Sequence, residues 1–213
     1  MLSKKISQLK PSPTLALAAK AKELKAQGKD VISLTVGEPD WPTYKVAKEA
    51  GIAAINENKT RYTPASGIPD LKKAVAKMTS EQLGMDFKPT NVTIGSGAKY
   101  IIYAALYALC DEGDEVIIPA PYWVSYPTMV ELAGGTPRIV TCKEETNFKL
   151  TAIQLRESIR ENTKVLLLNS PSNPTGAGYT ESELRALADV LLKHPHVHVM
   201  CDDIYEHLVY GDF

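Results

Sequence analysis

Two adjacent carboxylates, Asp202 and Asp203, directly follow the apolar stretch HVHVMC, and a phenol, Tyr205, comes three residues after the first of them. A carboxylate at the end of a buried strand loses hydration, so it needs a cation or hydrogen-bond donors nearby. We expect Asp202 to be this buried acid and to meet a ligand. Asp203 fits a different role, as the cap of a helix that begins at Ile204.

Two other polar clusters follow predicted strands. SGAK, residues 96–99, opens a helix whose free amides and small residues suit a phosphate, although the motif taken alone is better explained as a plain strand-to-helix turn. NSPSNPTG, residues 169–176, is by default a turn, but its dense Pro and Asn predict a rigid loop that holds Asn173 toward a ligand. Trp123 is placed to cover a flat ring. Together the clusters predict a ligand with a phosphate, a flat ring and a basic ring nitrogen, and pyridoxal 5′-phosphate has all three.

Two hydrolase mechanisms compete with this interpretation. His194, His196 and His198 alternate and would share one face of a strand, which allows a zinc-dependent hydrolase. Pro195 interrupts the stretch, and the histidines lie near the strand's amino end, away from Asp202. We therefore expect no metal. A Ser/His/Asp hydrolase lacks its GxSxG motif here.

The elements that must position these clusters alternate between strand and helix. TKVLLLN is apolar on both faces, which is typical of a parallel sheet covered on both sides. Ligands of such a sheet bind beyond the carboxyl ends of its strands, where the three clusters lie. The predicted fold is therefore α/β, a mostly parallel sheet with helices on both faces. Strands are predicted at residues 30–37, 91–95, 115–119, 136–140, 163–169 and 196–201, and helices at 13–27, 44–57, 70–83, 98–109, 127–133, 152–160 and 181–193.

Composition narrows the class of protein. The chain has 213 residues, 44% hydrophobic and 23% charged, with a net charge of −1. This suits a globular protein with a sizeable core and gives no support to nucleic-acid binding. No apolar stretch approaches the roughly 20 residues that span a bilayer. The three cysteines are expected to be reduced thiols, and the N-terminus does not have the pattern of a secretory signal. We therefore predict a cytoplasmic protein without nucleic-acid or membrane partners.

The polar segments, taken in order, resemble the class I pyridoxal-phosphate aminotransferases, most closely the bacterial aspartate aminotransferases, some of which also act on prephenate or aromatic substrates. The resemblance covers essentially the whole chain. It implies the large cofactor-binding domain of a fold-type I enzyme at residues 41–213, incomplete at its C-terminus, and an N-terminal arm with part of the small domain at residues 1–40. The segments that carry it are GEPD, RYTPASGIPDLKKAV, SGAK, GDEVIIPAPYWVSYP, NSPSNPTG and DDIYEHLVY.

The resemblance assigns roles to the matching positions. Asp202 would pair with the protonated pyridine nitrogen, Tyr205 and Asn173 would hydrogen-bond the ring's 3-oxygen, and Trp123 would stack on the ring. The amides of Ala98 and Lys99 would bind the phosphate, and Tyr62 would reach the phosphate of the other subunit in a homodimer. The implied substrate-binding residues are Gly37, Thr14 together with Ser12, Trp123 and Asn173.

The implied reaction moves the amino group of aspartate or glutamate to a 2-oxo acid. An aromatic or prephenate aminotransferase and a non-catalytic ligand-binding domain of the same fold are the alternatives. The family's Schiff-base lysine and its substrate-binding arginine are expected beyond Phe213, and no lysine follows Lys193. We therefore expect the full-length enzyme to be active and these 213 residues, which contain no matching catalytic residue, to be inactive alone.

Overall fold

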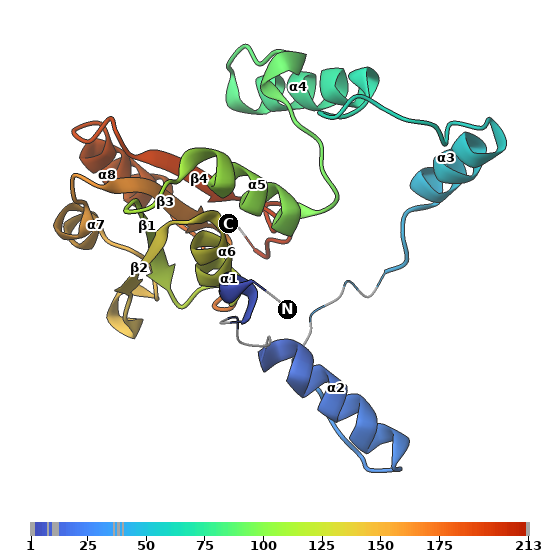
Figure 1. The fold of residues 1–213 in the computed structure, drawn as a ribbon, viewed down its shortest axis with the longest axis horizontal. Coiled ribbons are helices and arrows are strands. Elements are labelled where there is room, and N and C mark those ends of the chain that lie inside the picture. The colour runs from blue at the N-terminus through green and yellow to red at the C-terminus, as the bar shows by residue number, and fades with distance from the viewer. Residues whose placement is uncertain are drawn as a thin grey trace. The chain divides into compact units, whose positions relative to one another are not determined.

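The computed structural model describes residues 3–7, 9, 13–35, 37, 39 and 41–211. The chain divides into two compact units, one formed by Met1–Leu9 with Ser96–Phe213 and the other by Lys10–Gly95. The first unit contains the β-sheet (Figure 1). The domain boundary near residue 40 that the resemblance implies stays a prediction.

The sheet has four strands, all parallel, in the order β2-β1-β3-β4. Because the strands are parallel, their carboxyl ends lie at the same end of the sheet. The register places Asn169 opposite Asp202 there. The predicted strands at 115–119, 136–140, 163–169 and 196–201 are thus confirmed in position. Their bounds are β1 Glu115–Ala120, β2 Thr136–Thr141, β3 Thr163–Asn169 and β4 His198–Asp202.

Helices cover both faces of the sheet, as the apolar pattern predicts. Side chains alternate along β1, so that Val116 and Ile118 pack with α5 and α6, while Ile117 packs on the other face with α7 and α8. β3 alternates in the same way. The covering helices are α5 Ala98–Leu109, α6 Tyr126–Ala133, α7 Ala152–Ser158 and α8 Glu181–Leu191, and the unit also holds α1 Lys4–Ser7 and the short 3₁₀ helix η2 Glu144–Thr146.

The second unit is helical and holds little buried apolar surface. Its elements are α2 Pro13–Ala26, α3 Lys45–Asn56, α4 Pro69–Leu83 and the 3₁₀ helix η1 Pro89–Asn91. The strands predicted at 30–37 and 91–95 are wrong for the residues that the structure describes. A strand needs a neighbour for its backbone hydrogen bonds, and the Ile94 amide instead donates to the Ser66 carbonyl in a loop, at 3.0 Å.

No helix in the described ranges is both long and apolar enough to cross a membrane.

Candidate active site

At the carboxyl ends of the strands, Asn169 connects two of the predicted site residues, Asn173 and Asp202. The Asn169 side chain at the end of β3 donates from Nδ2 to the Asp202 backbone carbonyl, at 2.7 Å. Its Oδ1 accepts the Asn173 backbone N–H, at 2.8 Å. Asn169 therefore fixes the loop that carries Asn173 to the strand that ends at Asp202. Sequence reasoning missed Asn169, although its place as the first residue of NSPSNPTG was an available signal.

Asp202 is buried, with 8% of its surface exposed, whereas Asp203 is exposed. The Tyr126 hydroxyl donates to Asp202 Oδ2 at 2.7 Å, and the Ile204 N–H donates to Oδ1 at 3.3 Å. Within the described residues, no ion pair joins Asp202 to a Lys, Arg or His. A buried carboxylate with neutral donors and no counter-cation is suited to bind a cationic group.

Tyr126 was also missed from the sequence, where it is the seventh residue of the segment APYWVSYP. Burial raises the pKa of its phenol far above the ordinary value of 10, and the hydrogen bond to Asp202 raises it further. The phenol therefore keeps its proton and serves as a fixed donor. The helix predicted from Ile204 is wrong, because residues 204–207 form turns and the Ile204 amide bonds to Asp202 rather than to Asp203.

An aromatic surface lies beside the carboxylate. The Trp123 ring contacts the edge of Tyr126, with ring centroids 5.4 Å apart and planes at 84°. The Lys99 ammonium lies 4.8 Å from the centroid of the Trp123 ring. Trp123 thus connects the first turn of α5, where Lys99 lies, with the surroundings of Asp202. A flat ring stacked on Trp123 would lie within reach of both.

The start of α5 suits a phosphate. Gly97 precedes the helix with φ +87°, a conformation that favours glycine, and no side chain caps the helix. The first amides of a helix, here those of Ala98 and Lys99, have no acceptor within the helix. Both residues are exposed. A free helix N-terminus, a flat aromatic surface and a buried acid together fit the phosphate, ring and ring nitrogen of pyridoxal phosphate.

The remaining predicted site residues are less closely tied to this arrangement. Tyr205 is partly buried and lies near enough to Tyr126 to contribute to the raised pKa of that phenol. Gly37 and Tyr62 are exposed and Thr14 is partly buried in the second unit. Their places in the site stay predictions, and Ser12 lies outside the described residues.

The three histidines form no metal centre in the part of the chain that the structure describes. The rings of His194 and His196 contact each other edge-on, and His196 Nε2 lies 3.2 Å from the Arg160 carbonyl oxygen. Among the described residues, no group of three His, Cys, Asp or Glu side chains could hold a metal ion. The zinc-hydrolase interpretation therefore gains no support.

Comparison with known proteins gives one consistent family. Residues 29–213 match the family model described as aminotransferase class I and II. The probable aspartate/prephenate aminotransferase of Rhizobium leguminosarum bv. phaseoli is 53% identical over 212 residues, which are 100% of this chain and 53% of that protein. The aspartate aminotransferase of Geobacillus stearothermophilus is 50% identical over 210 residues, covering 99% of this chain and 53% of its own. The chain thus spans about half the length of these relatives.

Solved structures agree with the sequence relatives. The aspartate aminotransferase of Rhizobium meliloti superposes with a TM-score of 0.95 at 42% identity, over 100% of this chain and 53% of its own. The Thermus thermophilus aspartate aminotransferase with maleate gives a TM-score of 0.94 at 42% identity, over 99% and 55% of the two chains.

Proposed function

Because the chain belongs to the class I and II aminotransferase family, we propose that a full-length enzyme containing it moves the amino group of aspartate or glutamate to a 2-oxo acid. The cofactor would be pyridoxal 5′-phosphate, and the route ping-pong. The observation that carries this proposal is the buried Asp202 carboxylate, which has hydrogen-bond donors but no cation within ion-pair distance in the described residues. The names of the relatives support the substrate class.

The residues of this chain would hold and tune the cofactor. Bound pyridoxal phosphate supplies an electron-withdrawing ring that stabilises negative charge at the substrate's α-carbon. Asp202 would keep a proton on the ring nitrogen, and Tyr126 would hold the carboxylate in place for this task. Asn173 and Tyr205 would bond the ring oxygen, while Trp123 would cover one ring face and exclude water.

The phosphate would be held by the amides of Ala98 and Lys99 at the start of α5. Tyr62 would reach the phosphate site of a second subunit, so we propose that the full-length enzyme is a homodimer. The full exposure of the Tyr62 side chain supports a role for it in an intermolecular contact. A cytoplasmic location stays a prediction.

The experiment is an assay of amino transfer from aspartate to 2-oxoglutarate. The full-length enzyme should be active, and Asp202→Asn should lower its rate by orders of magnitude, because the ring nitrogen would lose its charged partner. The 213 residues alone should transfer no amino groups, since they carry no lysine that matches the family's Schiff-base lysine. An unchanged rate in Asp202→Asn, or turnover by the 213 residues alone, would contradict these assignments.

An aromatic or prephenate substrate is the second candidate. The observation that favours it is the aspartate/prephenate name shared by several relatives. Comparing turnover of aspartate, glutamate and phenylalanine, and of prephenate as the acceptor, separates the two candidates. A full-length protein that binds cofactor but turns over none of these substrates would favour the non-catalytic alternative.

A further inference from the structure

A lysine with a largely buried side chain contacts the end of the loop that carries Asn173, and the proposed reaction gives it no role. Lys149 follows η2, and only 12% of its side chain is exposed. Its ammonium lies 2.6 Å from Glu183 Oε1 and donates to Glu183 Oε2 at 2.7 Å and to the Gly178 carbonyl at 3.3 Å. Burying a lysine costs free energy unless its charge is paired. These contacts supply that pairing and hold the Lys149 ammonium in one position.

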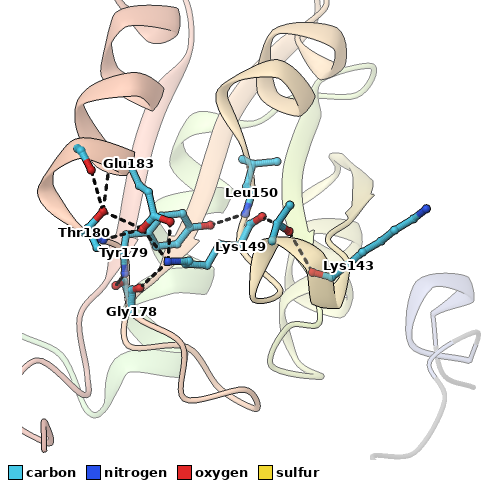
Figure 2. A network of polar contacts seen from close by, with 10 residues as sticks. Lys143, Lys149, Leu150, Gly178, Tyr179, Thr180 and Glu183 are labelled. Atoms are coloured by element: carbon cyan, nitrogen blue, oxygen red, sulfur yellow. Dashed lines mark hydrogen bonds and ion pairs between the residues drawn. The ribbon is translucent and has the colours of Figure 1, made fainter.

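Lys149 joins the segment before α7 to the stretch in which the 169–180 loop runs into α8 (Figure 2). Glu183 belongs to the first turn of α8, where it also accepts hydrogen bonds from the Thr180 amide and hydroxyl. Gly178 and Tyr179 close the loop that begins at Asn169. The Tyr179 hydroxyl in turn accepts a hydrogen bond, at 2.8 Å, from the N–H of Leu150, which follows Lys149 in the chain. The end of the loop and the start of α8 are therefore both tied to the segment around Lys149.

The contacts continue from this end of the loop to the site. The Tyr179 N–H donates to Ser170 Oγ at 3.2 Å, which joins the two ends of the loop. The Ser172 N–H donates to the Ala177 carbonyl at 3.0 Å, which closes the loop around Asn173. Lys149, Asn173 and Tyr126 also line one cavity of about 20 Å³, room for about one water molecule. Lys149 and Asn173 therefore border the same cavity, and the hydrogen bonds of the loop link them indirectly.

We propose that Lys149 is a positioning residue of the cofactor site, which holds the 169–180 loop in the conformation that presents Asn173. Asn169 fixes the start of the loop at the end of β3. The ion pair of Lys149 with Glu183 fixes the other end of the loop, where α8 begins. The role of Asn173 toward the cofactor rests on the proposed function, whereas the hold of Lys149 on the loop does not. The two are tested by separate measurements.

The first measurement is amide hydrogen exchange by NMR in the full-length enzyme that contains this chain. Lys149→Met keeps the length of the side chain and removes its charge, so exchange at the Asn173, Gly176 and Ala177 amides should accelerate by about tenfold or more. The β3 amides of Leu166 and Leu167 should not change. Lys149→Arg, which restores a cation, should return the loop amides toward the wild-type rate.

Arg185→Met is the matched control. Arg185 forms an ion pair with Glu181 on the same helix, at 2.7 Å, but both side chains are largely exposed, and among the described residues no hydrogen bond or ion pair joins either side chain to the loop. It should leave the loop amides unchanged. The proposal is overturned if Lys149→Met leaves loop exchange unchanged, or if loop and β3 amides accelerate together, which is general destabilisation. Should Lys149→Met fail to fold, Lys149→Gln decides the same point, since it removes the charge but keeps a donor for Gly178.

The second measurement is titration of the same variants with pyridoxal 5′-phosphate, followed by tryptophan fluorescence. Lys149→Met should weaken binding by about threefold to tenfold, while Arg185→Met should not, because only the first loosens the loop. Absence of binding in the wild type counts against the proposed function, and the exchange result still decides the role of Lys149. Wild-type affinity in Lys149→Met, alongside a loosened loop, would overturn its connection to the cofactor site.

Discussion

At the scale of single residues, the site depends on a buried carboxylate that two neutral donors hold in place. The Tyr126 hydroxyl is the stronger of the two by distance, at 2.7 Å against 3.3 Å for the Ile204 amide. Removing it leaves a carboxylate oxygen buried without that donor. Tyr126→Phe should therefore lower the free energy of unfolding by about 1–3 kcal/mol.

Urea denaturation measures this change. Tyr100→Phe is the control, since Tyr100 is 60% exposed, and substitutions at such surface positions shift stability by less than about 0.5 kcal/mol. Equal stability of Tyr126→Phe and the wild type would show that the hydrogen bond to Asp202 contributes nothing to the fold.

The same residues show how far sequence reasoning reaches. The apolar residues of HVHVMC are enough to predict the burial of Asp202, because a strand of a covered parallel sheet ends at that position. The partners of Asp202 are not predictable in this way. Tyr126, 76 positions away in the chain, reaches the Asp202 carboxylate, and Asn169, 33 positions away, reaches the Asp202 backbone carbonyl. Only the packing of the folded unit brings these groups together.

At the scale of elements, α8 and the segment before α7 are joined by one charged contact. The hydrogen bond from Lys149 is the main reason that the pKa of Glu183 lies below its ordinary value of 4.5, with the Thr180 amide second. A lowered pKa means that the contribution of Glu183 to stability is fully present above pH 4.5 and is lost as the pH falls below it, through the lowered pKa.

The difference in unfolding free energy between wild type and Lys149→Met should therefore shrink as the pH falls below 4.5. Lys149 is the cation that faces Glu183, and the Tyr179 phenol, whose pKa burial raises to about 12, stays neutral throughout. Urea denaturation from pH 7 to pH 3 measures the difference. A constant difference over that range would mean that the charge of Glu183 is not what holds Lys149.

Elements also differ in how well the sequence predicts them. β3 is predictable because its apolar residues pack against helices on both faces, and β4 pairs in parallel with β3 in the same unit. The segments at 30–37 and 91–95 have similar apolar patterns but no strand among the described residues. The apolar pattern of a sequence segment predicts which face of a strand would be buried. Whether the segment forms a strand also depends on a neighbouring strand to pair with, which the pattern does not identify.

At the scale of the whole molecule, the sheet has an open edge. β4 pairs with β3 on one side, and no strand of the described residues pairs with its other side. Val199, within β4, is 48% exposed. Unpaired strand edges with apolar side chains promote association, so the 213-residue protein should aggregate, and Val199→Lys should slow its aggregation. Light scattering at constant concentration measures the rate.

Val46→Lys provides the comparison, because Val46 is 75% exposed but lies on helix α3 in the second unit, whose described residues form no strand. It adds the same charge to the molecule. If both variants slow aggregation equally, net charge is responsible, and the open edge of β4 is not.

The central claim, that Asp202 binds the protonated ring nitrogen of pyridoxal phosphate, is tested most directly on that nitrogen. The ¹⁵N chemical shift of ring-labelled cofactor is measured by NMR in the full-length enzyme, at a pH where the free ring is unprotonated. With the wild-type protein, the shift should be that of a protonated ring nitrogen, because a buried carboxylate stabilises the charged ring. With Asp202→Asn it should be that of an unprotonated nitrogen. Bound cofactor whose ring nitrogen is protonated to the same extent in both proteins would contradict the claim.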